Sequence, residues 1–340
     1  MLGHSGGSLC LLALLLAACG GAGSGSATTA ATPAVATPPP VVVTPPVSAD
    51  PPVAVVPPVV VVPPVVVVPP VVVVPPVVVV PPVVIAPPVI PGPQGTRVLV
   101  WSDEFDVSGL PNASKWDYDT ERNRLGWYNN ELQYYARDRL ENARVESGKL
   151  IITARKEDLT SAADYGGQHY TSARLLTRGK ASWIYGFFEV RAKLPCGAGT
   201  WPAIWTLGTG GRWPEDGEID IMEQRGNNKT VILGTIHTRA NNYFNGSLGV
   251  GLGSQTTVSD ACTNFHNYQL TWTAEKIVIG VDGVNYFEYL NPNTGDYYRW
   301  PFSNPQFLIL NLAIGGDLGG PVDPAFTTQQ MEVDYVRVYQ

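Results

Sequence analysis

Three carboxylates are crowded into one short stretch of the chain, GEIDIMEQ at residues 217–224. Glu218, Asp220 and Glu223 fall within six residues, and the positions between them are apolar. Simultaneous ionisation of adjacent carboxyl groups is unfavourable because like charges repel, so at least one of them is expected to have a raised pKa. A protonated carboxyl beside an ionised one can supply an acid together with a nucleophile or base, the combination that glycoside hydrolysis requires.

The element that must position these groups is a strand. Interleaved isoleucine and methionine indicate a buried strand, and alternation places Glu218 and Asp220 on one face of it but Glu223 on the other. An extra residue at 221–222, a β-bulge, would return Glu223 to the shared face, and bulges are frequent beside active sites. We therefore predict a bulged strand that presents three carboxylates to one concave surface. The alternative is a structural edge strand with inward-pointing charges.

Tryptophan residues precede the acidic strand closely. Trp201 and Trp205 lie in GTWPAIWTLG, and Trp213 lies in GRWPEDGEID. Tryptophan faces can stack on the C–H faces of sugar rings, so a tryptophan-lined cleft with carboxylates suits a polysaccharide substrate. Because tryptophan is bulky and usually buried, each of these residues could instead belong to the core.

The region beyond residue 97 has the pattern of an all-β protein. Segments rich in Val, Ile, Thr and aromatic residues recur between Gly, Pro and Asn, and the DG pair in IVIGVDGVNYFE indicates a hairpin. Many strands at this spacing predict a sandwich or a barrel, and a sandwich with one concave face would offer a groove. The clearest predicted strands lie within residues 149–156, 181–194, 229–238, 268–283, 306–316 and 330–340.

Charge and aromatic content divide the chain into two parts. All 22 Lys and Arg residues and all nine Trp residues lie at or beyond Arg97, and only Asp50 of the 29 acidic residues precedes it. We predict one globular domain at 97–340, a size that supports a single large core. With 22 basic and 28 acidic residues this domain has a net charge of −6 and no basic stripe, which argues against nucleic-acid binding.

The first 96 residues predict export and a spacer. Residues 9–18 form an apolar run too short to span a bilayer, which needs about 20 residues, but suitable for a signal peptide. The run ends in LAAC, which resembles a bacterial lipobox, so residues 1–19 are predicted to be a lipoprotein-type signal with lipidation at Cys19. The absence of a basic residue ahead of the run leaves a plain secretory signal or a misassigned start codon as alternatives. Residues 20–96, with their PPVVVV repeats, are predicted to be a disordered linker, because paired prolines block sheet formation.

Two cysteines remain within the domain, Cys196 in LPCGAG and Cys262 in SDACTN. An even pair in loop-like contexts of an exported protein favours one disulfide, with two free thiols as the alternative. The sequence contains no Cys–His cluster that suggests zinc.

Several motifs together resemble glycoside hydrolase family 16. GEIDIME matches the E-x-D-x-x-E signature of that family, and the resemblance extends over essentially all of residues 97–340. The chain is similar to the bacterial endo-1,3-β-glucanase, or laminarinase, branch of the family in a series of motifs that follow in order. These are WSDEF, NNELQYY, SARLLTRGKASWIYGFFEVRAKLP, GTWPAIWTLG, TIHT, FHNYQLTW, LILNLAIGG and VDYVRVYQ.

This resemblance implies a β-jelly-roll sandwich of two curved antiparallel sheets with a concave substrate cleft, and hydrolysis with retention through a double displacement. Glu218 would be the nucleophile that forms a glycosyl-enzyme, Glu223 the general acid and then the base, and Asp220 the group that balances their protons. Retaining chemistry expects the two catalytic carboxyls to lie about 5–5.5 Å apart. The residues expected to contact sugar are Trp201, Trp213, Arg174, Asn130, Gln224 and His237.

The same resemblance implies one structural calcium ion and no cofactor for catalysis. The matching positions are Glu104, the backbone carbonyl of Gly148, and Asp334, since hard oxygen ligands suit calcium. Ordinary polar contacts are the alternative for the two carboxylates.

Three functions remain open from the sequence. The first is an endo-acting β-1,3-glucanase, and the second is the same mechanism on mixed-linkage β-1,3-1,4-glucan or on a galactan. The third is a non-catalytic glucan-binding module, against which the presence of both Glu218 and Glu223 argues. We expect a monomer with a polysaccharide substrate and with membrane contact only through an N-terminal lipid anchor. It would be located at the bacterial cell surface or in the periplasm, or would otherwise be secreted.

Overall fold

A computed structural model describes residues 89–92, 95–242 and 252–340 of the chain. All of these residues lie in one compact unit, Val80–Gln340. The predicted signal peptide, the lipobox at Cys19 and most of the predicted linker lie outside the described residues. Within the described part the structure is almost entirely β, and its one helix, α1 (Gly316–Gly319), is four residues long. No helix in this part of the chain is long and apolar enough to cross a membrane.

The larger sheet has 11 strands. Its main path runs β16-β15-β14-β9-β18-β6-β7-β4, with β2 beside β18, β1 beside β2, and β5 beside β6. The pairs are antiparallel except for β4 and β7, which are parallel. The bounds are β1 (Val89–Gly92), β2 (Gly95–Asp103), β4 (Gln133–Tyr135), β5 (Ala143–Glu146), β6 (Lys149–Lys156), β7 (Tyr170–Ser172), β9 (Gly186–Lys193), β14 (His266–Trp272), β15 (Lys276–Val281), β16 (Val284–Leu290) and β18 (Thr328–Tyr339).

The smaller sheet contains the acidic stretch. Its seven strands follow the order β13-β12-β11-β10-β17-β8-β3, so the acidic strand β11 lies between β12 and β10. Strand β17 is apolar except for Gln306 and Asn311 and is buried along its whole length, as expected for a central strand. The bounds are β3 (Asp117–Tyr118), β8 (Arg174–Leu176), β10 (Thr200–Gly208), β11 (Glu218–Arg225), β12 (Asn228–His237), β13 (Leu252–Thr257) and β17 (Gln306–Ile314).

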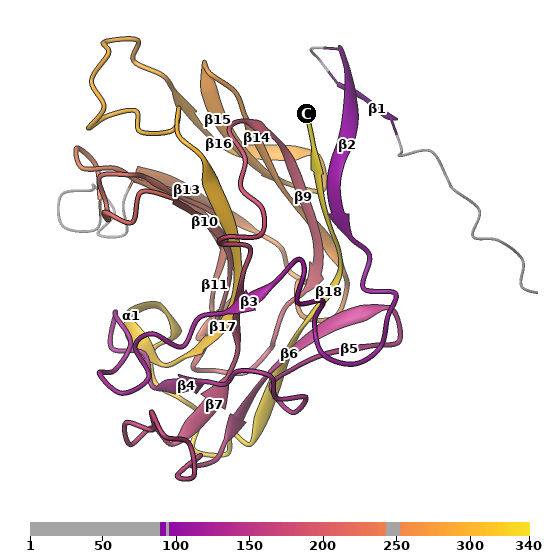
Figure 1. The fold of residues 1–340 in the computed structure, drawn as a ribbon, viewed down its shortest axis with the longest axis vertical. Coiled ribbons are helices and arrows are strands. Elements are labelled where there is room, and N and C mark those ends of the chain that lie inside the picture. The colour runs from indigo at the N-terminus through magenta and orange to yellow at the C-terminus, as the bar shows by residue number, and fades with distance from the viewer. Residues whose placement is uncertain (1–88, 93–94, 243–251) are drawn as a thin grey trace, which may run out of the picture. The chain divides into compact units, whose positions relative to one another are not determined.

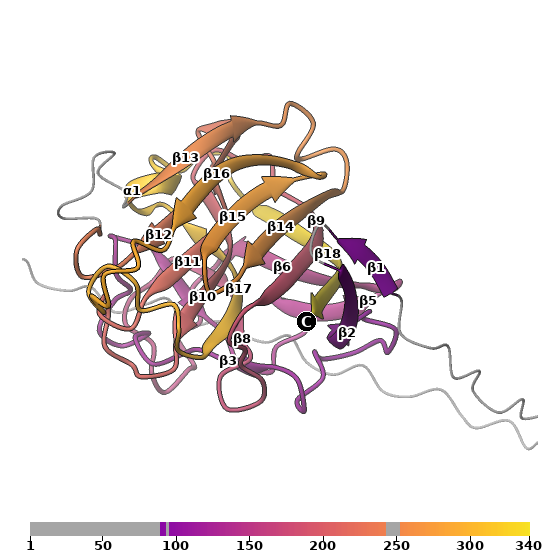
Figure 2. The same cartoon turned by 90° about the horizontal axis from the view of Figure 1, so that it is seen from above.

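The two sheets pack face to face around one apolar core (Figures 1 and 2). Ile219 and Ile221 of β11 are fully buried in this core, in the same cluster as Phe188 and Trp272 of the larger sheet. One face of β11 therefore supplies the core, and its other face is left for the carboxylates. The sandwich of two curved, mainly antiparallel sheets confirms the predicted all-β jelly-roll fold class.

Strand pairing begins earlier than the predicted domain boundary. β1 pairs with β2, and β2 in turn pairs with β18, so residue 97 lies within a strand. β1 starts directly after the last proline pair of the repeats, at the first position where paired prolines no longer prevent a ladder. β1 is an edge strand, so its own Pro91 is tolerated there.

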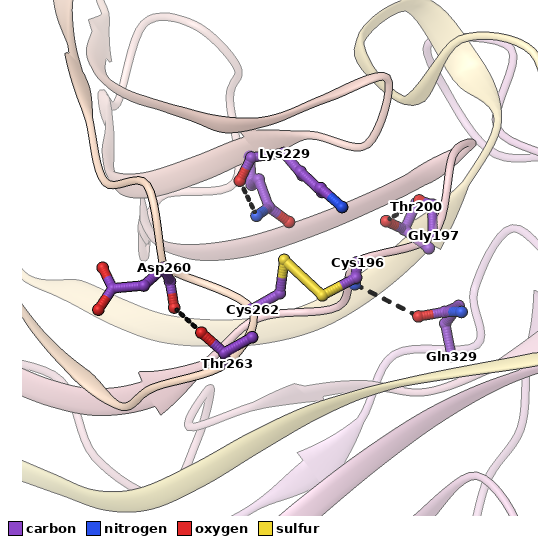
Figure 3. Close-up of a disulfide and its surroundings, with 9 residues drawn as sticks. Cys196, Gly197, Thr200, Lys229, Asp260, Cys262, Thr263 and Gln329 are labelled. Atoms are coloured by element: carbon purple, nitrogen blue, oxygen red, sulfur yellow. Dashed lines mark hydrogen bonds between the residues drawn. A yellow bond between two sulfur atoms is a disulfide. The ribbon is translucent and has the colours of Figure 1, made fainter.

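Cys196 and Cys262 form the disulfide that the sequence favoured (Figure 3). Their Cα atoms are 5.3 Å apart and their positions are separated by 66 residues. Cys196 precedes β10 of the smaller sheet, whereas Cys262 lies in the turn before β14 of the larger sheet. The bridge therefore ties the segment entering β10 to the opposite sheet, and the Cys196 amide also donates to the side chain of Gln329 at 3.3 Å.

Candidate active site

The β-bulge predicted in β11 is present. Asp220 pairs with Thr235 of β12 and Glu223 pairs with Leu233, so three steps along β11 match two steps along β12. A register shift is also found on the β10 side. The extra residue turns Glu223 back to the face that carries Glu218 and Asp220.

At the start of β11 a carboxylate oxygen of Glu218 lies within 4.8 Å of one of Asp220, and a ring nitrogen of His237 lies within the same distance of both. The indole N–H of Trp213 donates to Glu218. Asp220 is 2% exposed, its Oδ2 accepts a hydrogen bond from the Thr235 hydroxyl, and the same oxygen lies 3.3 Å from His237 Nε2. Burial and then the charge of Asp220 raise the pKa of Glu218 well above its usual range. This environment therefore disfavours the ionised form of Glu218.

Glu223 occupies a buried position farther along the same strand. Its side chain is 8% exposed, and its Oε1 accepts a hydrogen bond of 3.0 Å from Trp201 Nε1. Burial and the charge of Asp220 raise the pKa of Glu223 to about 8, although His237 and Trp201 act in the opposite direction. Glu223 is therefore protonated near neutral pH and available as an acid.

His237 supplies the positive charge of the site. It is the cross-strand partner of Glu218, and its ring centroid lies 5.9 Å from that of Trp213. Burial lowers the pKa of His237, but the neighbouring Glu218, Asp220 and Glu223 raise it by more, so the net pKa is about 9. His237 is therefore an imidazolium at neutral pH, and it offsets part of the negative charge on β11.

A row of positions on the cleft face crosses the smaller sheet from Glu223. The strand register aligns Glu223 of β11 with Ala203 of β10, Asn311 of β17 and Arg174 of β8. Neighbouring strands lie about 4.8 Å apart, so this row extends over about 14 Å. The row therefore extends away from the carboxylates across three strand spacings.

Aromatic rings hold the polar side chains of this row in place. The Arg174 guanidinium lies 4.6 Å from the ring centroid of Trp205 and 5.3 Å from that of Trp127. Arg174 Nε is 3.1 Å from Asp119 Oδ2, and Trp205 Nε1 donates to Asn311 Oδ1 at 2.7 Å. Arg174 and Asn311 are thus fixed on the cleft face, where their N–H groups are suited to bind sugar hydroxyls.

Asn130 lies on an exposed turn at the rim of the cleft. Its Nδ2 donates to Asp317 Oδ1 of α1 at 2.8 Å. A Cβ placed on Gly316 of α1 would contact both the Trp201 ring and Glu131, so α1 and this turn adjoin the Trp201 end of the site. The structure therefore brings Asn130 near the cleft but not into contact with the carboxylates of β11.

Gln224 is not placed to contact a sugar. It is fully buried, and its Nε2 donates to the backbone carbonyl of Lys229 at 2.7 Å. Because the bulge returns Glu223 to the cleft face, alternation sends the next side chain to the opposite face. The prediction of Gln224 as a sugar contact is therefore wrong.

The two carboxylates predicted to bind calcium have arginine partners. Glu104 accepts hydrogen bonds of 3.0 and 2.7 Å from Arg337, and Asp334 forms an ion pair with Arg191. Gly148, whose carbonyl was the third predicted ligand, lies between β5 and β6 with a φ of 69°. As arranged, these side chains do not fit a calcium site. Calcium binding there stays a prediction that requires both carboxylates to exchange their arginine partners.

Four residues of the cleft were not predicted as site residues: Trp205, Asn311, Glu131 and Tyr135. The Tyr135 hydroxyl bonds to both Asn311 and Glu131, at 3.1 and 3.3 Å. Trp205 could have been found by parity, since it lies four positions after Trp201 on one strand. Asn311 gave a signal as an amide inside the apolar stretch FLILNLAI, because a buried amide needs a partner. Glu131 and Tyr135 lie in the motif NNELQYY, far from β11 in the sequence, and within that motif only Asn130 was predicted to contact sugar.

The fold and the site together define a class of protein. One face of a β-sandwich carries three neighbouring carboxyl groups, and indole groups donate to two of them, Glu218 and Glu223, each of which has a raised pKa. This is the apparatus of a glycoside hydrolase that works through two carboxyl groups.

The chain belongs to the glycosyl hydrolases family 16, whose model matches residues 130–337. It is 51% identical over 253 residues to a beta-glucanase of Rhodothermus marinus, a match that covers 71% of this chain and 85% of the relative. Among solved structures it is similar to SCLam, a non-specific endo-beta-1,3(4)-glucanase from family GH16, with 54% identity and a TM-score of 0.69 over 75% of this chain and 96% of that chain. It is also similar to the laminarinase from Rhodothermus marinus, with 51% identity and a TM-score of 0.66 over 72% of this chain and 97% of that chain.

Proposed function

We propose that this protein is an endo-acting, retaining glycoside hydrolase that cleaves β-1,3-glucan of the laminarin type. The observation that carries the proposal is the bulged strand β11, which presents Glu218, Asp220 and Glu223 to one cleft. Their environments suit different roles, because the pKa of Glu223 is raised to about 8, as an acid near neutral pH requires, whereas Glu218 lies beside Asp220, which can take up its proton. Family membership and the laminarinase relatives support β-glucan as the substrate class.

The first chemical step cleaves the glycosidic bond. Glu223 donates its proton to the glycosidic oxygen as the bond from that oxygen to the anomeric carbon breaks. Glu218 gives its own proton to Asp220 and, as a carboxylate, bonds to the anomeric carbon to form a glycosyl-enzyme. His237 is an imidazolium in this pH range, so it stabilises the negative charge that this step leaves on Glu223.

The second step releases the sugar. Glu223, now ionised, takes a proton from a water molecule, whose oxygen bonds to the anomeric carbon as the bond to Glu218 breaks. The proton on Asp220 returns to Glu218, and Glu223 is again protonated for the next cycle. Two inversions at the anomeric carbon give net retention.

We infer an endo mode of action from the row of positions that crosses the smaller sheet beside the carboxylates. The row from Glu223 through Asn311 to Arg174 extends over several strands, so it can hold sugar units beyond the cleaved bond. A chain bound along such a row can be cut at an internal linkage. Mixed-linkage β-1,3-1,4-glucan is the second candidate substrate, and the description of the relative SCLam as a non-specific endo-beta-1,3(4)-glucanase favours it over a galactan.

Reducing-sugar release from laminarin, lichenan and agarose tests this function. The wild type should release sugar from laminarin, and Glu218→Gln should lose this activity by several orders of magnitude. Glu332→Gln is the matched control, because Glu332 is paired with Lys149 and Lys193 on the larger sheet, and it should remain active. If the wild type binds laminarin but releases no reducing sugar, the proposal that the protein is an enzyme is refuted. If reducing sugar is released from agarose alone, the proposal of a glucan substrate is refuted.

We also propose that the protein is exported and held at a membrane through lipid on Cys19, with the Pro- and Val-rich stretch as a spacer and the enzyme acting as a monomer. The apolar run followed by LAAC supports the anchor. Metabolic labelling with a radioactive fatty acid should label the wild type and not Cys19→Ser. Equal labelling of both proteins would refute lipidation at Cys19.

A further inference from the structure

Thr235 of β12 lies beside the carboxylates of β11, on the same face of the sheet. It is the cross-strand partner of Asp220, and its side chain is fully buried, so it has no exposed surface with which to touch a sugar. Its hydroxyl donates a hydrogen bond to Asp220 Oδ2, the same oxygen that lies 3.3 Å from His237 Nε2. One oxygen of Asp220 therefore has two donors supplied by β12.

These two donors determine where Asp220 can accept a proton. A carboxylate oxygen that already accepts from a hydroxyl and an imidazolium has little capacity for a third hydrogen. The other oxygen, Oδ1, is therefore left to exchange a proton with Glu218, a carboxylate oxygen of which lies within 4.8 Å of one of Asp220. The last torsion of an aspartate side chain is soft, so without a fixed Oδ2 the carboxyl group could turn away from this arrangement.

We propose that Thr235 is a positioning residue for the reaction, whose hydroxyl fixes Asp220 Oδ2 so that Oδ1 faces Glu218 during proton exchange. The inference rests on the proposed function. In the exchange one O–H bond on Glu218 breaks and one O–H bond on Asp220 forms, so the total charge of the pair does not change. Glu218 is then ionised when it attacks the anomeric carbon.

The hydroxyl also stabilises the charge of the pair. Several groups around the Glu218–Asp220 pair are acidic, and a donor on Oδ2 offsets part of their combined negative charge. Loss of the donor should therefore raise the pH at which the Glu218–Asp220 pair takes up a second proton, which sets the acid limb of kcat/KM. The titratable groups facing Asp220 are Glu218 and Glu223 on β11, His237 on β12 and Tyr286 on β16, and β10 contributes the uncharged Trp205.

The test compares pH profiles of kcat/KM on laminarin. Thr235→Val and Thr235→Ala both remove the hydroxyl and should move the acid limb to higher pH by about one to two units, the size expected for one hydrogen bond to a charged group. Thr235→Ser keeps the hydroxyl and should restore the wild-type limb. KM should stay within about twofold, because Thr235 does not reach the cleft, whereas kcat should fall.

Thr206→Val is the matched control. Thr206 is a fully buried threonine of β10 whose hydroxyl donates to Gln306 Oε1, so this variant loses a buried hydrogen bond away from the carboxylates. Its acid limb should match that of the wild type. Provided that the wild type hydrolyses laminarin, three results would overturn the positioning role alone. They are an unshifted acid limb in Thr235→Val and Thr235→Ala, an equal shift in Thr206→Val, and a failure of Thr235→Ser to restore the wild-type limb. If Thr235→Val does not fold, the alanine and serine variants decide, and a wild type that does not hydrolyse laminarin would refute the proposed function itself.

Discussion

Replacing Trp201 with phenylalanine removes one hydrogen-bond donor from Glu223 and keeps an aromatic ring at the same position. In the wild type the indole N–H lies 3.0 Å from Glu223 Oε1, and each of the two residues is 8% exposed. The bond stabilises the ionised carboxylate, so it lowers the pKa of Glu223, which burial and Asp220 have raised to about 8. Its loss should therefore raise that pKa further.

The expected size follows from the burial of both partners. A hydrogen bond to a charged group contributes about 1.5–3 kcal/mol, and one pKa unit corresponds to about 1.4 kcal/mol. The alkaline limb of kcat/KM reports the acid of the free enzyme, so it should move from near pH 8 to higher pH by about one to two units. Loss of sugar contacts to Trp201 would lower the height of the profile but would not move its limb.

The assay is a pH profile of kcat/KM on laminarin for the wild type, Trp201→Phe and Trp205→Phe. Trp205 is the matched control, since it lies on the same strand and its Nε1 donates to Asn311 rather than to a carboxylate. Its replacement should leave the alkaline limb in place. An unshifted limb in Trp201→Phe, or an equal shift in both variants, would refute the assignment of Glu223 as the acid tuned by Trp201.

Three further predictions concern stability. Glu223→Gln should raise the unfolding free energy above pH 8 by on the order of a few kcal/mol and change it little near pH 4.5. The reason is that a carboxyl whose pKa is raised in the folded state makes the folded protein less stable as the pH rises towards that pKa. Urea unfolding at the two pH values measures this effect, and an equal gain at both would contradict it. Removing the disulfide with Cys196→Ser and Cys262→Ser should lower the unfolding free energy by about 2–5 kcal/mol, since the bond closes a long loop, and an unchanged denaturation midpoint under oxidising conditions would refute its structural role. With Glu104 and Asp334 paired to arginines, EDTA should shift the melting temperature by less than about 2 °C, and a larger drop reversed by calcium would show that these carboxylates exchange their partners.

The sequence was most informative where one strand contains the whole pattern. The parity conflict at Glu223 could be resolved only by a bulge, so the register of β11 followed from residue types alone. The same reasoning, carried one residue further, would have placed Gln224 in the core, because alternation resumes after the bulge. Apolar alternation likewise indicated the strands of both sheets, since burial of one face is what drives their formation.

Contacts between distant segments could not be predicted from local pattern. Thr235 is brought to Asp220 by strand register, and Arg174 is placed between two tryptophans by segments that are far apart in the sequence. The arginine partners of Glu104 and Asp334 also depend on tertiary packing, which residue types do not specify. Secondary structure and the acidic strand were therefore predictable, whereas the electrostatic environment of each carboxyl was not.

The central claim is that Glu218 becomes covalently bonded to the sugar during turnover. An activated 2-deoxy-2-fluoro laminari-oligosaccharide should form a glycosyl-enzyme that reacts onward slowly, and proteolysis with mass spectrometry then locates the bond. We predict a sugar ester on Glu218, with none in Glu218→Gln. A sugar attached to Glu223 instead, or no adduct together with products of inverted anomeric configuration, would contradict the account.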